Sequence, residues 1–257
     1  MSDRKWKLSV LITTYNESDQ IEDSLKSVLW ADEIVVVDSF STDNTPEIVK
    51  KYPVRLLQRA YAGPADQKNW GLEQVSFDWT LILDADEVVP PELTAEIQDI
   101  LNKGTSYDAF RIPRLNHFMN QPIRYSGWQN DSVIRLVRKD KCRYNNLQVH
   151  EEIETQNILL GKLKNQLIHY TFKNARHYLD KLIRYSEWSA QDKSAGKSGK
   201  VTLFHLALKP LVRFIKHYFL QMGFLDGKTG FVVCSLMAWS VFLRYYFMLN
   251  RNQKSDR

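Results

Sequence analysis

Short apolar runs alternate with helix-like segments through the first part of this 257-residue chain. Strand-like runs occupy residues 8–13, 34–37, 54–57 and 77–83. Helical spacing is seen over 18–30, and further helices are expected from Thr45, which can cap the first turn ahead of Pro46, and over 67–75. Parallel strands need crossover connections, so this alternation predicts an α/β fold with a mostly parallel sheet flanked by helices. Ligands are expected at the carboxyl ends of the strands.

The chain becomes more irregular after Pro91. We expect a helix over 92–101, strands over 109–112, 133–137 and 167–170, and an amphipathic helix over 176–192. A small basic linker follows at 193–200. It is no phosphate loop, because it lacks the required glycine pattern and does not follow a strand. The pattern predicts one domain over residues 1–192 and a C-terminal extension over 201–250.

The extension is strongly aromatic and apolar but carries interspersed basic residues. Phe231–Leu249 is nearly long enough to cross a bilayer, yet Arg244 lies well inside it and no second span is clear. Two amphipathic helices divided at Gly223–Gly227 fit better. They predict association with a membrane surface, with a hairpin packed on the catalytic core or on a second subunit as the alternative.

Composition limits the class of protein. The chain is 44% hydrophobic and 25% charged, which is typical of a folded globular protein. A net charge of +5 is compatible with anionic substrates or an anionic membrane, but is too small to indicate nucleic acid. Cys142 and Cys234 lie far apart, which predicts free thiols in a reducing compartment. The N-terminus lacks the apolar core of a signal peptide, so we expect a cytoplasmic protein.

The run Leu81–Glu87 (LILDADE) ends an expected buried strand with two carboxylates. Residues two apart on a strand share a face, so Asp84 and Asp86 should project together from its carboxyl end. Close carboxylates repel unless a cation or hydrogen-bond donors neutralise them. A divalent cation that also binds phosphate oxygens would meet this need. An isolated Asp-x-Asp is a weak signal, because many such pairs are solvated turns or caps.

Three further polar segments accompany this motif. Thr13–Glu17 (TTYNE) follows the first strand, Val37–Thr45 (VDSFSTDNT) follows the second, and Gln67–Gly71 (QKNWG) precedes the fourth. As an ordered set they resemble the family 2 glycosyltransferases of the GT-A fold, over the chain up to about Pro90. The sequence departs from the family's V-D-D-G-S pattern, because Ser39 and Phe40 follow Asp38.

The resemblance implies a GT-A fold with a mixed, mostly parallel sheet and a site for a UDP-sugar. Asp38 would accept from a uracil N–H, Lys68 would reach phosphate or a base edge, and Asp84 would meet ribose or sugar. A divalent Mn²⁺ or Mg²⁺ would be held by Asp86, with Asp84 and His150 as further ligands. The residues assigned to the nucleotide sugar are Thr13, Tyr15, Glu17, Asp38, Lys68 and Asp84. We expect Asp43 to organise its loop rather than contact the donor.

An inverting transfer also requires a general base for the acceptor hydroxyl. Asp131 lies in a segment similar to the family's E-D-x-x-x-R-L region, with Asn130 in place of the Glu. Glu151 lies in Val149-His150-Glu151 (VHE), and the combination of the R-L pair with this downstream V-H-E resembles a subset acting on lipopolysaccharide core and related acceptors. Both residues remain candidates for the base. Arg135 and Arg138 would hold phosphate or pair with carboxylates.

The whole-chain pattern resembles lipopolysaccharide core β-glucosyltransferases that use UDP-glucose. It implies a lipid-linked saccharide acceptor and a peripheral location on the inner face of the cytoplasmic membrane. The donor sugar rests on the resemblance alone. Two alternatives are a nucleotidyltransferase, which would normally need an N-terminal Gly-rich phosphate loop that is absent here, and a non-catalytic membrane-surface scaffold with an inherited fold.

Overall fold

The structure is a computed structural model that describes residues 5–145, 152–172, 178–179, 182–187, 189–190 and 201–255. It divides into two compact units. The first unit contains Met1–Arg114 and Asp131–His169. The second contains Leu115–Asn130 and Tyr170–Arg257. The expected boundary near residues 193–200 falls on residues outside the described part, and the division at that point stays a prediction.

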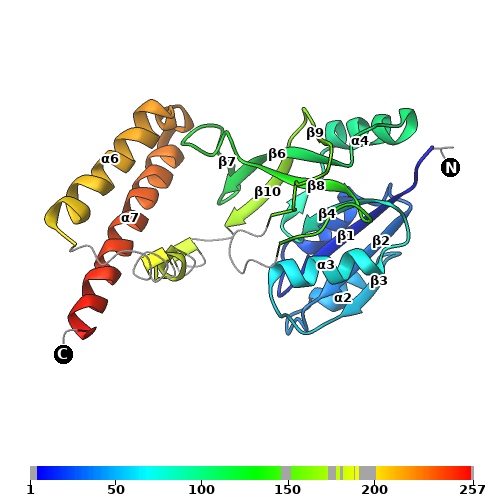
Figure 1. The fold of residues 1–257 in the computed structure, drawn as a ribbon, viewed down its shortest axis with the longest axis horizontal. Helices are drawn as coiled ribbons and strands as arrows, with labels where there is room; N and C mark the ends of the chain where they lie inside the picture. The colour runs from blue at the N-terminus through cyan, green and yellow to red at the C-terminus, as the bar shows by residue number, and fades with distance from the viewer. Residues whose placement is uncertain are drawn as a thin grey trace. The chain divides into compact units, whose positions relative to one another are not determined.

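Four parallel strands form one half of the sheet in the first unit, in the order β3-β2-β1-β4. They are β1 (Leu8–Thr14), β2 (Glu33–Asp38), β3 (Arg55–Gln58) and β4 (Trp79–Asp84). The crossovers are α1 (Ile21–Ser27), α2 (Thr45–Val49) and α3 (Pro64–Gln74). Because these strands are parallel, their carboxyl ends lie at the same end of the sheet (Figure 1). The polar residues predicted at those ends therefore come together there.

The sheet continues with antiparallel strands. β8 (Ser132–Arg138) pairs with both β4 and β6 (Ala109–Phe118), and β10 (Leu167–Phe172) pairs with β5 (Glu87–Val88). The remaining elements are β7 (Gln121–Pro122), β9 (Leu160–Lys162) and α4 (Pro91–Lys103). The predicted α/β fold with a mixed sheet is confirmed.

Helices cover both faces of the parallel strands. On one face, Leu25 of α1, Val49 of α2 and Ile97 of α4 share a core with alternate residues of β1 and β4. On the other face, Leu72 of α3 packs with Leu11 of β1. A side chain at Gly71 would place its Cβ 2.7 Å from Leu11 Cδ1, so the glycine allows α3 to lie close to β1. This close packing places Lys68 of α3 near Asp84, at the carboxyl end of β4.

The C-terminal part of the second unit is a helical hairpin, as the sequence predicts. Its first arm contains η1 (Phe204–Leu208), α6 (Lys209–Ile215) and η2 (Lys216–Leu220). After η3 (Gly223–Asp226), α7 (Gly227–Ser255) runs back beside α6 (Figure 1). Lys209 Nζ donates to Tyr245 Oη at 2.7 Å between the arms. Residues 178–179, 182–187 and 189–190 are helical, in agreement with the predicted amphipathic helix.

The hairpin turn is tied to the loop after β7. Asp226 accepts from the backbone N–H groups of Arg124 and Tyr125, both at 3.0 Å, and from Ser126 Oγ at 2.9 Å. His217 Nδ1 donates to the Ser126 carbonyl at 2.9 Å. By length and composition, Gly223–Asn250 is a helix that could cross a membrane. About a fifth of its most apolar window is buried within the protein (22%).

Candidate active site

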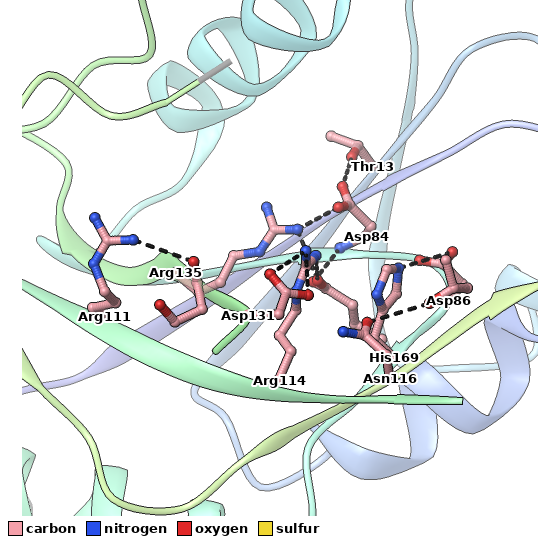
Figure 2. A network of polar contacts seen from close by, with 12 residues as sticks. Thr13, Asp84, Asp86, Arg111, Arg114, Asn116, Asp131, Arg135 and His169 are labelled. Atoms are coloured by element: carbon pink, nitrogen blue, oxygen red, sulfur yellow. Dashed lines mark hydrogen bonds and ion pairs between the residues drawn. The ribbon is translucent and has the colours of Figure 1, made fainter. Parts of the chain in front are cut away.

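Asp84, the last residue of β4, lies at the centre of a polar network (Figure 2). Thr13 of β1 stands beside it in register and donates from Oγ1 to Asp84 Oδ1 at 3.3 Å. Lys68 Nζ lies 3.1 Å from the same oxygen, and Arg135 of β8 pairs with Oδ2. Burial favours a raised pKa for Asp84, but the charges of Arg135 and Lys68 outweigh it and lower the pKa. Asp84 is therefore an ionised carboxylate that protein cations hold in place, and its predicted contacts with the sugar and the metal stay predictions.

Glu87 of β5 belongs to the same network and is fully buried. Its Oε1 accepts from Arg135 Nη2 at 2.8 Å and from Arg114 Nη1 at 3.3 Å, and its Oε2 accepts from the Asp84 backbone N–H at 3.0 Å. Burial acts to lower the pKa of Arg135, but Asp84 and Glu87 raise it well above its ordinary value. The buried charges are thus balanced, as a low-dielectric site requires.

Asp131 directly precedes β8, and Arg114 holds its carboxylate through two hydrogen bonds. Arg114 Nε donates to Asp131 Oδ2 at 3.0 Å, and Arg114 Nη2 donates to Oδ1 at 3.1 Å. The Asp131 side chain keeps 29% of its surface exposed. It lines a cavity of about 300 Å³ together with Lys68, Asp84, Arg111, Arg135, Tyr144 and Glu152. A substrate in this cavity would meet an oriented carboxylate.

Asp86 lies beside a histidine, His169, that is distant from it in the sequence. His169 Nε2 of β10 lies 3.5 Å from Asp86 Oδ2, and both side chains are mostly buried. A carboxylate oxygen is a ligand that suits Mn²⁺, and an imidazole nitrogen is a ligand for several divalent transition metals. Within the part of the chain that the structure describes, no group of three or more such ligands occurs. Asp86 and His169 are thus two possible ligands, and a metal bound there would need further ligands from substrate, water or residues outside the described part.

The loops after β1 and β2 are fastened to one another. The Asn16 N–H donates to Ser41 Oγ at 2.9 Å, and the Ser18 N–H donates to Asp43 Oδ2 at 3.1 Å. Asp43 Oδ1 also accepts from the N–H and hydroxyl of Thr45. Burial acts to raise the pKa of Asp43, but the hydrogen bonds from Thr45 and Ser18 outweigh it and lower the pKa to about 2. Asp43 organises its loop, in agreement with the prediction.

A family model described as Glycosyl transferase family 2 matches residues 9–155, which contain β1–β4, the two loops and Asp131. The chain belongs to glycosyltransferase family 2. It is similar to the "Lipopolysaccharide core biosynthesis glycosyltransferase LpsC" of Rhizobium meliloti, with 28% identity over 94% of each chain. It is also 30% identical to an uncharacterized glycosyltransferase of Rickettsia prowazekii, over 97% of this chain and 89% of the relative.

The chain is also distantly similar to solved structures. Staphylococcus aureus TarS 1-349 in complex with UDP-GlcNAc is 14% identical, with a TM-score of 0.49 over 98% of this chain and 92% of that one. Glucosyl-3-phosphoglycerate synthase from Mycobacterium tuberculosis, solved with Mn²⁺ and UDP, is 23% identical. Its TM-score is 0.37, over 41% of this chain and 42% of that one.

Within this family 2 chain, the predicted residues differ in their accessibility. Thr13 and Lys68 both contact Asp84, whereas Tyr15 is exposed on the loop after β1. Asp38 is buried, and its carboxylate accepts from the Ser41 N–H, Ser41 Oγ and Gln58 Nε2. Glu17 is partly buried. His150 and Glu151 lie outside the described residues, so their assignments stay predictions.

Three residues of the network were not predicted from the sequence: Glu87, Arg114 and His169. Glu87 directly follows the Asp-x-Asp, where its charge suggests no more than an exposed turn. His169 is the polar residue in the strand-like run Leu167–Tyr170, and Arg114 lies in β6, beyond the expected strand 109–112. A polar residue inside an apolar strand is the signal that would have marked His169.

Proposed function

We propose that this family 2 enzyme is an inverting, metal-dependent hexosyltransferase that uses UDP-glucose. The acceptor is a lipid-linked saccharide, with the lipopolysaccharide inner core as the preferred candidate. The observation that carries the proposal is the shared cavity, where the Asp84 cluster on β4 meets the oriented Asp131 on β8. The similarity to LpsC, whose name places it in lipopolysaccharide core biosynthesis, supports the acceptor class.

We assign binding of the donor nucleotide sugar to the carboxyl ends of β1, β2 and β4, together with Lys68 of α3. Tyr15, Glu17 and Asp38 belong to the nucleoside end, and Lys68 with Thr13 orients Asp84 toward ribose or sugar. Asp86 and His169 would hold Mn²⁺ or Mg²⁺ at the diphosphate. The bound cation would neutralise the negative charge that develops on the departing UDP. The protein then needs no protonated group for the leaving oxygen.

Asp131 is the proposed general base, with Glu151 as the second candidate. Arg114 holds both Asp131 oxygens from one side, which fixes the carboxylate plane while leaving part of its surface open to the cavity. An acceptor hydroxyl there would lose its proton to the carboxylate as it attacks the anomeric carbon. A single displacement on an α-linked donor gives a β-linked product.

The hairpin is proposed to lie on the inner face of the cytoplasmic membrane. Its exposed large apolar residues include Leu203, Phe204, Leu208, Leu211, Val212, Ile215, Phe219, Leu220, Phe224, Leu225, Phe231 and Trp239. Lys209, Arg213, Lys216 and Lys228 supply positive charge, and the acidic Asp226 is occupied by the loop after β7. Apolar and basic side chains on one hairpin suit an anionic membrane surface.

A donor screen against truncated lipopolysaccharide cores, read by mass spectrometry, tests the reaction. We expect one hexose to be added from UDP-glucose in the presence of Mn²⁺. Asp86→Ala should lower turnover by at least a hundredfold while the protein stays folded, because the metal loses its carboxylate ligand. Wild-type turnover in that variant after chelation of metal would refute the metal role. Absence of hydrolysis or transfer with any nucleotide sugar would refute the function itself.

A further inference from the structure

Two side chains that line the cavity beside Asp84 carry polar atoms without a hydrogen-bond partner among the described residues. Arg135 and Tyr144 line it and are only 4% and 5% exposed. Arg135 Nε and Tyr144 Oη are buried, and neither finds a hydrogen-bond partner among the described residues. Buried polar atoms without partners are costly. They indicate a ligand that brings acceptor oxygens into the cavity.

Arg111 of β6 adds a cation that no carboxylate balances within the described part of the chain. Its Nη1 donates to the Ser132 carbonyl at 3.2 Å, and no ion pair is formed. A guanidinium offers five N–H donors in a planar fork that matches phosphate or carboxylate oxygens. Glu152, which also lines the cavity, is exposed and forms no ion pair with the described cations.

Arg111 lies on the side of the cavity where the acceptor saccharide is expected to bind. Figure 2 shows Arg111 and Asp86 at opposite ends of the network, with Asp131 and Arg135 between them. The carbonyl that Arg111 contacts belongs to Ser132, the residue after Asp131. An acceptor whose hydroxyl meets Asp131 would place a neighbouring substituent beside Arg111. The donor diphosphate belongs at the other end, where Asp86 faces His169.

We propose that Arg111, together with Arg135 Nε and Tyr144 Oη, binds an anionic substituent of the acceptor saccharide. The substituent is a phosphate ester or a carboxylate, since both present acceptor oxygens to a guanidinium. This inference rests on the proposed transferase function and narrows its acceptor to an anionic sugar. It makes Arg111 a specificity residue for the acceptor.

Sugar binding to the full-length protein, saturated with UDP and Mn²⁺, tests the assignment. Calorimetric titrations would compare glucose 6-phosphate, glucuronic acid and glucose. We expect at least one anionic sugar to bind at least tenfold more tightly than glucose, and the tighter one identifies the chemical group. Arg111→Gln should weaken that binding by about tenfold to a hundredfold, the usual effect of losing hydrogen bonds to a charged group. Arg111→Lys, which keeps the charge but loses the fork, should give a smaller loss.

Lys162→Gln is the matched control. Lys162 of β9 lies in register with Arg111 and is exposed, but it does not line the cavity. Equal losses in Lys162→Gln and Arg111→Gln would mean a general field effect and overturn the proposal. So would equal binding of glucose and the anionic sugars, or a matching loss of UDP affinity in Arg111→Gln. If the wild type binds no UDP, the transferase function fails, while Arg111-dependent binding of an anionic sugar would still support the subsite.

Discussion

Asp131 and Glu151 can be separated as bases at the scale of single residues. Asp131→Asn keeps the size of the side chain but removes its ability to take a proton. If Asp131 is the base, turnover should fall at least a hundredfold while UDP affinity, measured by calorimetry, stays within about twofold. Glu151→Gln is the paired variant and should then keep most of its turnover. The opposite pattern would move the base to Glu151, and full activity in both variants would exclude both residues.

Asp43 should make folding stability depend on acid pH. Its pKa is lowered from 3.8 to about 2, so it stabilises the folded state above its ordinary pKa. That contribution should disappear as the pH falls from about 4 to about 2. Asp43→Asn should lower the urea midpoint at pH 7 and flatten the stability curve within this pH range. Asp140→Asn is the control, because Asp140 lies on an exposed turn. The same pH dependence in wild type and Asp43→Asn would contradict this assignment.

The residues at the ends of local strands were predictable, but their partners were not. Asp84 and Asp86 follow an apolar run, and that pattern alone places them at a strand end. Arg135 and His169 reach them only because β8 pairs with β4 and β10 pairs with β5. Pairing between strands distant in sequence is set by the whole core, and no local pattern in β8 or β10 reveals it.

At the scale of secondary structure, the parallel strands were predicted within one or two residues. The apolar runs of β1, β2 and β4 are buried on both faces and bounded by turns, which is a strong local signal. α1 is shorter than the predicted 18–30, because Val28 at its C-terminal end leaves the helical conformation with a φ of −124°. Val28 is fully buried, so packing rather than helical spacing determines where α1 ends.

The contact between the hairpin turn and the loop after β7 depends on a glycine. Gly127 has a φ of +85°, and a Cβ there would overlap the ring of His217. Gly127→Ala should therefore lower the free energy of unfolding by about 2 kcal/mol or more, from backbone strain plus overpacking. Gly227→Ala provides the comparison, because Gly227 also has positive φ, +62°, but no atom lies within 4 Å of its added Cβ. Equal shifts in their urea midpoints would show that the His217 contact contributes nothing.

At the scale of the whole molecule, membrane binding should depend on the exposed apolar side chains of the hairpin. Leu203 and Leu220 are 79% and 73% exposed. The double variant Leu203→Asp/Leu220→Asp should lose most flotation with vesicles containing phosphatidylglycerol, because charge replaces apolar surface at the interface. Leu159→Asp, at a 58% exposed position of the first unit, should float like the wild type. Flotation that neither variant changes would refute the proposed membrane surface.

The order of strands in the sheet has a consequence for synthesis on the ribosome. The parallel strands β1 to β4 emerge first and can pair with one another once β4 has left the exit tunnel, because all their partners lie within this first segment of the chain. β4 then has an open edge until β8 arrives, and Arg135 follows Asp84 by 51 residues. His169 emerges later still. Translation should therefore yield a nascent chain whose parallel half-sheet has folded before β8 and β10 exist, which makes that open edge the natural target for a chaperone.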